Sequence, residues 1–369
     1  MTPAISGRER VPGLDTLRFF CALWVVFAHI PPFPTNQFLG KDSLLELALR
    51  GVLKNLFCGP AAVTVFFVIS GFCIHFPQRN GRPLAWGAFY AQRFIRIGIP
   101  FAVAVTIGYL AGLKGLQIGW ESFRIGAEHR QEAEQAASIL WSLVAEMTYY
   151  ALYPSLLWAS RRIQWKGVFL LSILGALAVL ATDPRARFFP HFGNSLTPIL
   201  GLPSWLLGVF LAEAFHQFKD GTVSRPAIWA WRLGVIGSAS ALQALFFHPP
   251  SFFSYVGYPW TLQFYAVLAF FWLQREIQWW RQNPPVPVFE WLGGWSYSIY
   301  LFHVAAPPTV GWLMQSLGRP ALPPLALALL RNLMVFPLCY LFARVVEFPS
   351  WTLARRVGSR LRESATKGG

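Results

Sequence analysis

The sequence is poor in charged residues, and acidic residues are the scarcer kind. Only 13% of its 369 residues are Asp, Glu, Lys or Arg, whereas about a quarter of an average soluble domain is charged. Hydrophobic residues make up 55% of the chain and aromatic residues 17%. Because so few polar side chains could not cover a water-exposed surface, the composition excludes a soluble globule, a disordered chain and a fibrous repeat. It predicts a protein that folds within a bilayer.

Cysteine is also scarce, and its positions do not form a metal-binding pattern. All four cysteines lie inside or at the ends of apolar stretches, with no Cys-x-x-Cys pair and no histidine partner at zinc spacing. We interpret them as small apolar side chains and expect no metal site. They are Cys21, Cys58, Cys73 and Cys339.

Long apolar stretches recur along nearly the whole chain. A membrane-spanning helix needs roughly 20 apolar residues, and about ten stretches are long enough. The segments between them are short, and the longest, at 114–138, is expected to form a surface helix or a lid. We therefore predict an all-α polytopic membrane protein with a cytoplasmic N-terminal segment at 1–13, one transmembrane domain at 14–349 and a basic cytoplasmic tail at 350–369. The expected spans are 14–31, 56–76, 97–113, 139–158, 167–182, 196–213, 227–247, 257–274, 292–313 and 324–346.

The net charge of +15 has two candidate explanations. Clustered Lys and Arg are typical of nucleic-acid binding, but they also mark the cytoplasmic loops of membrane proteins. With the N terminus placed in the cytoplasm, about two thirds of the 31 basic residues fall on the cytoplasmic side. Membrane orientation therefore explains the charge, with both termini in the cytoplasm, and no nucleic-acid partner is expected. The basic tail suits contact with anionic membrane lipid.

Ionisable side chains inside the predicted spans are few, so each is a candidate functional residue. Arg18 and His29 lie eleven residues apart on the first span, which is close to three helical turns and about 16 Å. Their side chains therefore share one face, with His29 in the outer half of the membrane. Counted along their own spans, Glu146 and His303 reach similar depths. The sequence predicts that His29, Glu146 and His303, which lie on three separate helices, converge.

Two arginines open the third predicted span. Arg93 and Arg96 are three residues apart and share a helix face, where two guanidinium groups suit a polyphosphate. Arg18 is expected at the same boundary of the membrane. Purely structural roles for these residues stay open. The arginines can serve only as membrane anchors. His303 can form a hydrogen bond between helices, and Glu146 can pair with an arginine.

Six short sequence blocks occur in order between residues 13 and 349. They are Gly13-Leu14-Asp15 with Arg18 and His29; Val65-Phe66-Phe67-Val68-Ile69-Ser70-Gly71-Phe72; Arg93-x-x-Arg96; Trp141-Ser142-Leu143 with Glu146; Ser296-Tyr297-Ser298-Ile299-Tyr300-Leu301 with His303; and Glu347-Phe348-Pro349. None is specific alone, but this ordered set resembles the acyltransferase-3 family of integral membrane acyltransferases. One departure is Thr64, where relatives often carry an acidic residue.

The resemblance implies an activity and its partners. Members of this family move an acyl group, most often acetyl, from cytoplasmic acyl-CoA to a sugar hydroxyl at or beyond the far face of the membrane. We therefore expect an O-acetyltransferase of a bacterial inner membrane, with acetyl-CoA as the donor and a glycan or lipid-linked saccharide as the acceptor.

By the same likeness, His29 is expected to be the essential catalytic histidine, with Glu146 as a second catalytic residue at a recurrent acidic position. Arg18, Arg93 and Arg96 are expected to bind the CoA donor. The expected acceptor-binding residues are Trp141, Tyr149, Ser296, Tyr297 and His303.

Two chemical routes and one different function stay open. The imidazole of His29 can take the proton from the attacking hydroxyl, or it can accept the acyl group and pass it on, and we favour direct transfer. The rival from another class is a secondary transporter of a glycan precursor or an anion, because ionisable residues near the midplane also mark transport paths. A transporter is expected to carry inverted repeats, which the sequence does not display. A non-catalytic scaffold has no need for ionisable groups at matched depth.

Overall fold

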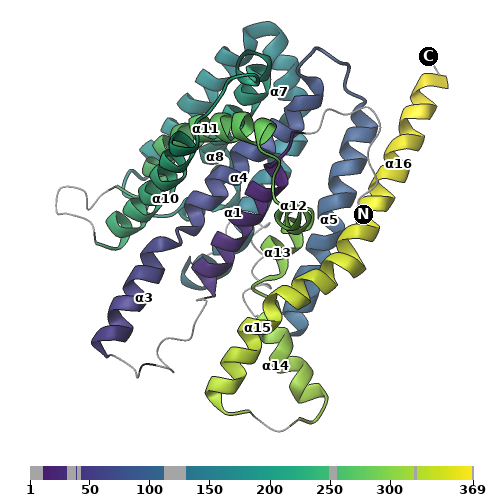
Figure 1. The fold of residues 1–369 in the computed structure, drawn as a ribbon. Coiled ribbons are helices and arrows are strands. Elements are labelled where there is room, and N and C mark those ends of the chain that lie inside the picture. Colours follow the sequence, from purple (N-terminus) through teal and green to yellow (C-terminus); the bar gives the residue numbers. More distant parts are fainter. Residues whose placement is uncertain are drawn as a thin grey trace.

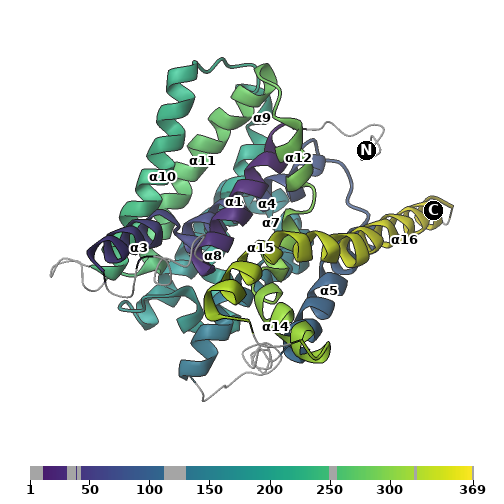
Figure 2. The same cartoon turned by 60° about the horizontal axis from the view of Figure 1, so that its bottom comes forward.

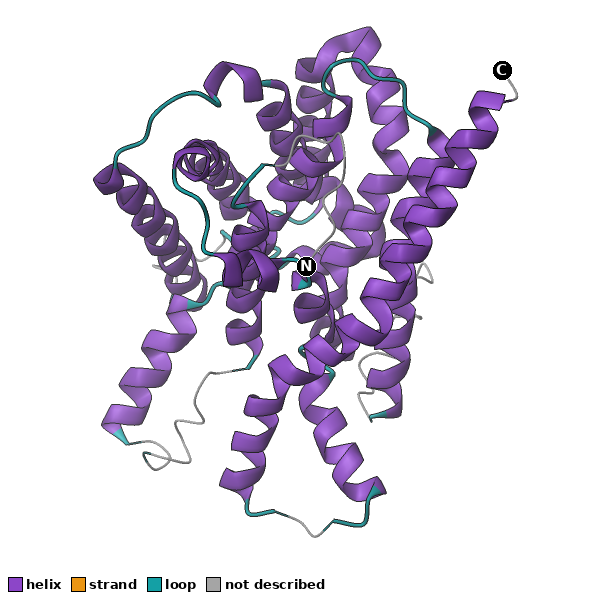
Figure 3. Cartoon of the chain, turned by 45° about the vertical axis from the view of Figure 1, so that its right-hand side comes forward, coloured by secondary structure: helices purple, strands orange, loops and turns teal. Residues whose placement is uncertain are grey.

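The described part of the chain is folded almost entirely into helices (Figure 1, Figure 3). The computed structural model describes residues 11–30, 39, 43–111, 130–248, 256–319 and 322–367, with the side chains of all but 130–140 and 364–367. No strand occurs in this part of the chain. The elements are α1 (Leu14–His29), α3 (Leu44–Leu56), α4 (Gly59–His75), η1 (Phe76–Gln78), α5 (Trp86–Leu110), α7 (Arg130–Thr182), η3 (Phe189–Phe192), α8 (Gly193–Glu213), α9 (Phe215–Phe218), α10 (Arg225–Phe247), α11 (Tyr258–Gln282), α12 (Pro287–Gly293), α13 (Ser296–Phe302), α14 (Ala306–Ser316), α15 (Pro324–Phe342), η5 (Ala343–Glu347) and α16 (Phe348–Lys367).

Six helical segments among the described residues are long and apolar enough to cross a membrane. They confirm the prediction of an all-α polytopic membrane protein, and the number of about ten crossings stays a prediction. The six segments are Leu44–Gln78, Trp86–Leu110, Trp141–Thr182, Phe189–Glu213, Arg225–Phe247 and Pro324–Glu363.

Three predicted spans are not among these six. Helix α1 has only 16 residues, and α11 is rich in Gln, Tyr and Trp along its 25 residues. The span expected at 292–313 is broken into the three short helices α12, α13 and α14, so the prediction of one continuous helix there is wrong. The breaks lie near Gly293-Gly294 and before Pro307-Pro308, because glycine weakens a helix and proline cannot donate its backbone hydrogen bonds. His303 consequently lies in a turn directly after α13.

The fourth and fifth predicted spans are joined without a loop. Helix α7 runs for 53 residues, and only Gln164 has a non-helical backbone, with φ 60° and ψ 165°. One residue in the left-handed region is enough to redirect the chain between two helical segments. Of the surface helix expected at 114–138, residues 114–129 lie outside the described residues, and the chain is helical from Arg130.

Helices α4 and α8 form the centre of the bundle. Protein buries 78% of the apolar 18-residue stretch in the span that contains α4 and 67% of the corresponding stretch in the span that contains α8. The two helices meet at glycines, since a Cβ on Gly71 would overlap the carbonyl oxygen of Trp205, and one on Gly208 would overlap that of Val68. Small residues at such a crossing let two membrane helices approach closely.

We expect Gly71→Ala to destabilise the protein by about 3 kcal/mol, at the upper end of overpacking costs, because the added methyl group meets backbone atoms that cannot rotate away. The measurement is thermal unfolding of purified protein in nanodiscs. Gly98→Ala on α5 is the matched control, because nothing lies within 4 Å of a Cβ at Gly98. Equal melting temperatures for the two variants would contradict this account of the α4–α8 contact.

The outermost helices expose apolar side chains. On α7, four leucines one to three residues apart are exposed, and on α15 Leu333 is 73% exposed. Lipid tails are as apolar as leucine, so these surfaces match a bilayer and not water. The four leucines are Leu170, Leu171, Leu174 and Leu177.

The predicted basic tail is a helix that packs against the bundle. Helix α16 follows α15 through the π-helical turn η5 and lies along α5 (Figure 1, Figure 2). The contact is close at Gly358, where a Cβ would overlap the side chain of Gln92. The tail thus holds a defined position beside the basic segment that precedes and begins α5.

Candidate functional site

Helix α1 carries the two residues that the sequence singled out first, one near each end. Arg18 lies one turn into the helix, where its guanidinium group contacts Asp15 at 2.9 Å and the sulfur of Cys73 at 3.1 Å. His29 is the last residue of the helix. We call the two ends of the bundle the arginine end and the histidine end, and about 16 Å of helix separates them.

The histidine end brings two imidazole rings together. His303 Nε2 lies 3.2 Å from His29 Nδ1, and the ring centroids are 5.2 Å apart. His303 is completely buried, whereas His29 is exposed. The break after α13 makes this contact possible, because the turn at His303 directs its ring toward the end of α1. Two of the three groups predicted to converge therefore do so.

Backbone carbonyls define the protonation of both rings. His303 Nδ1 lies 2.8 Å from the carbonyl oxygen of Tyr300 and 3.1 Å from that of Ile299. A carbonyl only accepts hydrogen bonds, so His303 carries its proton on Nδ1 and presents a lone pair at Nε2. The proton of His29 is then on Nδ1, where Val25 O, at 2.9 Å, and His303 Nε2 both accept it. Nε2 of His29 is left with a free lone pair, as a general base requires.

Glu146 does not join the histidines, contrary to the predicted convergence. Its Oε1 accepts hydrogen bonds from Ser70, at 2.9 Å, and from Tyr150. One turn away on α7, Ser142 is hydrogen-bonded to Tyr300, three residues before His303 on the chain. Neither histidine is among the hydrogen-bond partners of Glu146 in the described part of the chain. Counting residues along separate spans could not show this, because the count does not determine how one helix lies against another.

Glu347 anchors the helix that leads to His303, and the sequence analysis gave it no role. Its Oε2 accepts hydrogen bonds from the backbone N–H of Ser298, at 3.1 Å, and from the Ser298 hydroxyl. A carboxylate near the N-terminus of a helix also interacts favourably with the helix dipole. The sequence blocks contain both residues of this contact, because Glu347 begins the last of the six blocks and Ser298 lies inside the fifth.

The arginine end gathers the three arginines that the sequence grouped. Arg18, Arg93 and Arg96 all lie within electrostatic range of Cys73. The Arg93 guanidinium is 5.8 Å from the ring centroids of Phe89 and Tyr150, and that of Arg96 is 5.5 Å from the ring of Trp351 on α16. The prediction that these charges share one boundary agrees with this geometry.

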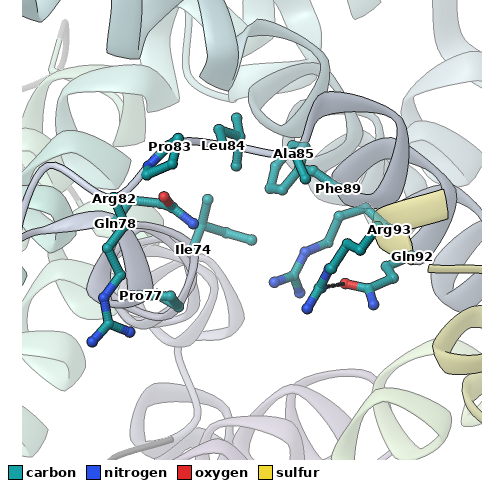
Figure 4. Close-up of a pocket in the computed structure, with 11 residues that line it drawn as sticks. Ile74, Pro77, Gln78, Arg82, Pro83, Leu84, Ala85, Phe89, Gln92 and Arg93 are labelled. Carbon is teal, nitrogen blue, oxygen red and sulfur yellow. Dashed lines mark hydrogen bonds between the residues drawn. The ribbon is translucent and has the colours of Figure 1, made fainter. Parts of the chain in front are cut away.

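A pocket of about 200 Å³ opens at the arginine end. Figure 4 shows Arg82 on one side of it and Arg93 and Gln92 on the other. Neither Arg18 nor Arg96 is among its lining residues. No sequence motif distinguishes Arg82 within the basic stretch before α5, and no local motif indicates that the tail supplies Arg362. The lining is Ile74, Pro77, Gln78, Arg82, Pro83, Leu84, Ala85, Phe89, Gln92, Arg93 and Arg362.

Two of the expected acceptor-binding residues are covered by protein in this structure. Trp141 is buried and stacks on Phe189 with centroids 5.1 Å apart and planes at 13°. Tyr149 is fully buried and donates its hydroxyl to the carbonyl oxygen of Pro198 at 2.9 Å. Both side chains are buried in the core of this structure, and the expectation that they bind the acceptor stays a prediction. An aromatic residue in a span gives no sign in the sequence of which face it presents.

Of the other three predicted acceptor residues, two make hydrogen bonds within the protein and one contacts His29. Ser296 donates its hydroxyl to the carbonyl oxygen of Gly293 at 2.8 Å and is buried, so it stabilises the start of α13. Tyr297 donates to the carbonyl oxygen of Ile97 at 3.0 Å and joins α13 to α5. Of the predicted acceptor-binding set, only His303 therefore lies against His29.

Comparison with known proteins gives the family. The model of the acyltransferase domain of the acyltransferase-3 family matches residues 11–344. Acyltransferase MdmB of Streptomyces mycarofaciens is 25% identical over 315 residues, which cover 80% of this chain and 78% of that protein. No solved structure gives a significant match. Because the family match includes both ends of α1, the histidine pair and the arginine cluster, this polytopic membrane protein belongs to the acyltransferase-3 family and is an acyltransferase.

Proposed function

We propose that this acyltransferase is an O-acetyltransferase that takes acetyl from acetyl-CoA at the arginine end and delivers it to a hydroxyl of a glycan or lipid-linked saccharide at the histidine end. The observation that carries the proposal is the His29–His303 pair, in which backbone carbonyls leave His29 Nε2 as the free basic nitrogen. Transfer of an acyl group to a hydroxyl is accelerated by a general base that takes the hydroxyl proton, and His29 Nε2 is the atom that can take it.

The donor binds by its phosphates at the arginine end. CoA carries several phosphate groups, and guanidinium groups recognise them by paired, charge-assisted hydrogen bonds. The pantetheine arm then extends along α1, and its thioester reaches the imidazole at the other end. Arg18 is placed to act along this route, because it lies on the same face of α1 as His29, with 28% of its side chain accessible.

The histidine pair then acts on one proton. The acceptor oxygen attacks the thioester carbonyl carbon, and the hydroxyl proton passes to His29 Nε2. The imidazolium that forms keeps its Nδ1–H on Val25 O and on the lone pair of His303, and both contacts stabilise the new charge. When the carbon–sulfur bond breaks, the proton passes to the CoA thiolate. Glu146 is hydrogen-bonded to Ser70 and Tyr150 and not to His29, so we assign it to the donor half of the site.

The arginine end faces the cytoplasm in this proposal, and both chain termini lie on that side. The excess of basic residues in the predicted cytoplasmic segments supports this orientation. The membrane is a bacterial inner membrane, because acyl-CoA is a cytoplasmic metabolite and the acceptor is a surface or exported glycan. Family membership as an acyltransferase favours this function over the transporter of a glycan precursor or an anion.

The test combines transfer in vitro with analysis of the product. Membranes that contain the protein are supplied with labelled acetyl-CoA, and alkali-labile label is measured in the glycan fraction. Surface polysaccharide from wild-type and deletion cells is compared by mass before and after mild base. A mass difference equal to one acetyl group, lost on base treatment, is expected. Identical polysaccharide from both strains, with no label transferred, would rule the function out.

A further inference from the structure

The pocket at the arginine end is built from three segments that are far apart in the sequence. The end of α4 with η1 and the loop that follows supplies Arg82 and most of the apolar wall, α5 supplies Gln92 and Arg93, and the C-terminal helix α16 supplies Arg362. Helix α16 therefore contributes to the pocket through Arg362, which lies there because α16 runs along α5.

Helix α16 is held in that position by its contact with α5. Arg362 donates a hydrogen bond to Gln92 Oε1 at 3.0 Å. One turn earlier, Gly358 is in such close contact with Gln92 that a larger residue would overlap it. The guanidinium group of Arg362 thus has a defined place at the pocket, although this helix belongs to a segment whose sequence reads as a basic tail.

The lining of the pocket has the chemistry of a nucleotide site. Three of its residues carry guanidinium groups, none of the lining residues is Asp or Glu, and the rest of the wall is largely apolar. Concave sites that combine an apolar wall with a few convergent polar groups are typical of small ligands. Arginine groups around an apolar surface suit a ligand with an aromatic ring and several phosphates.

We propose that Arg362 and Arg82 bind phosphate groups of the adenine nucleotide end of CoA, and that α16 therefore forms part of the donor-binding site. This inference rests on the proposed function. It assigns donor binding to two residues outside the family blocks, and it explains why a basic helix follows the last predicted span. Arg93 contributes to the same pocket, whereas Arg96 contacts Trp351 outside it.

The experiment measures equilibrium binding of CoA to full-length protein in phosphatidylcholine nanodiscs. Arg362→Ala and Arg82→Ala are each expected to weaken CoA binding about 10- to 100-fold, as expected for loss of one charge-assisted hydrogen bond. Arg356→Ala is the matched control, because it removes the same charge from the same helix at an exposed position outside the lining. Adenosine 3′,5′-bisphosphate should compete with CoA for the wild-type protein, and more weakly for Arg362→Ala. Thermal unfolding of each variant verifies its folding.

The outcomes separate this inference from the function on which it rests. CoA binding that is lost in Arg93→Ala but unchanged in Arg362→Ala and Arg82→Ala would overturn the inference and leave the function standing. An equal loss in Arg356→Ala would also overturn it, because net charge alone would then explain binding. A wild-type protein that does not bind CoA, but that retains anionic lipid through purification only when Arg362 is present, would make the pocket a headgroup site and overturn both proposals.

Discussion

Substitution of His29 by alanine should reduce acetyl transfer by about 10²- to 10⁴-fold, the range that a general base contributes. His29 Nε2 is the only nitrogen of the pair that is unprotonated and accessible, because the lone pair of His303 is directed at His29. Alanine removes the base and leaves the hydroxyl proton without an acceptor. The measurement is the initial rate of label transfer from acetyl-CoA to the glycan fraction at saturating donor.

The variant should stay folded, with a loss of stability no larger than about 1–3 kcal/mol, the cost of removing the hydrogen-bond partner of the buried His303 Nε2. His29 is the exposed last residue of α1, so truncating its side chain leaves no cavity in the core. His248→Ala is the control, because His248 is also an exposed histidine directly after a long helix. Full activity in His29→Ala, with normal expression, would remove the catalytic assignment. His303→Gln should retain part of the activity, because an amide can still accept a hydrogen bond from His29 Nδ1.

The second large effect is expected at the donor site. Arg93→Ala should raise the KM for acetyl-CoA about 10- to 100-fold, which corresponds to the loss of charged hydrogen bonds to phosphate. The KM for the acceptor should stay within about twofold, because the predicted acceptor site is at the opposite end of the bundle. The measurement is a pair of saturation curves, one for each substrate, in the same membrane preparation.

Arg96→Ala is the informative comparison for Arg93. The sequence treats the two arginines alike, but only Arg93 lines the pocket, and Arg96 lies over the Trp351 ring. A smaller rise in donor KM is therefore expected for Arg96→Ala. If either variant raised the KM for both substrates equally, loss of folding would be the better explanation. Equal and large donor effects in both would show that CoA extends beyond the pocket toward Arg96 and Trp351.

Several features of the site could be predicted because they depend on one helix at a time. The shared face of Arg18 and His29 follows from helical periodicity, and the helix α1 carries both as expected. The grouping of Arg93 with Arg96 follows from their spacing and from the bias of basic residues toward one side of the membrane. Which residues of one helix share a face depends only on the rise and turn per residue, so the packing of neighbouring helices does not change it.

Other features could not be predicted because they depend on how helices rotate and tilt against each other. Trp141 and Tyr149 lie in predicted spans, but contact with Phe189 and Pro198 decides that both are core residues. Glu146 is offset from the histidines by its hydrogen bonds to Ser70 and Tyr150. Apart from Glu146 and Tyr150, which lie one turn apart on α7, the members of these pairs are about 50 or more residues apart, so no short sequence window contains both.

The amino-acid sequence by itself determined that this protein is a polytopic helical membrane protein and that α1 carries a charge near one end and an imidazole at the other. Composition, hydrophobic length and helical periodicity are sufficient for these conclusions, because they are local properties of the chain. Only the tertiary structure decided that His303 meets His29 and that α16 completes the pocket beside α5. Both depend on contacts between segments about 270 residues apart, and such contacts arise from the packing of whole helices and leave no local pattern.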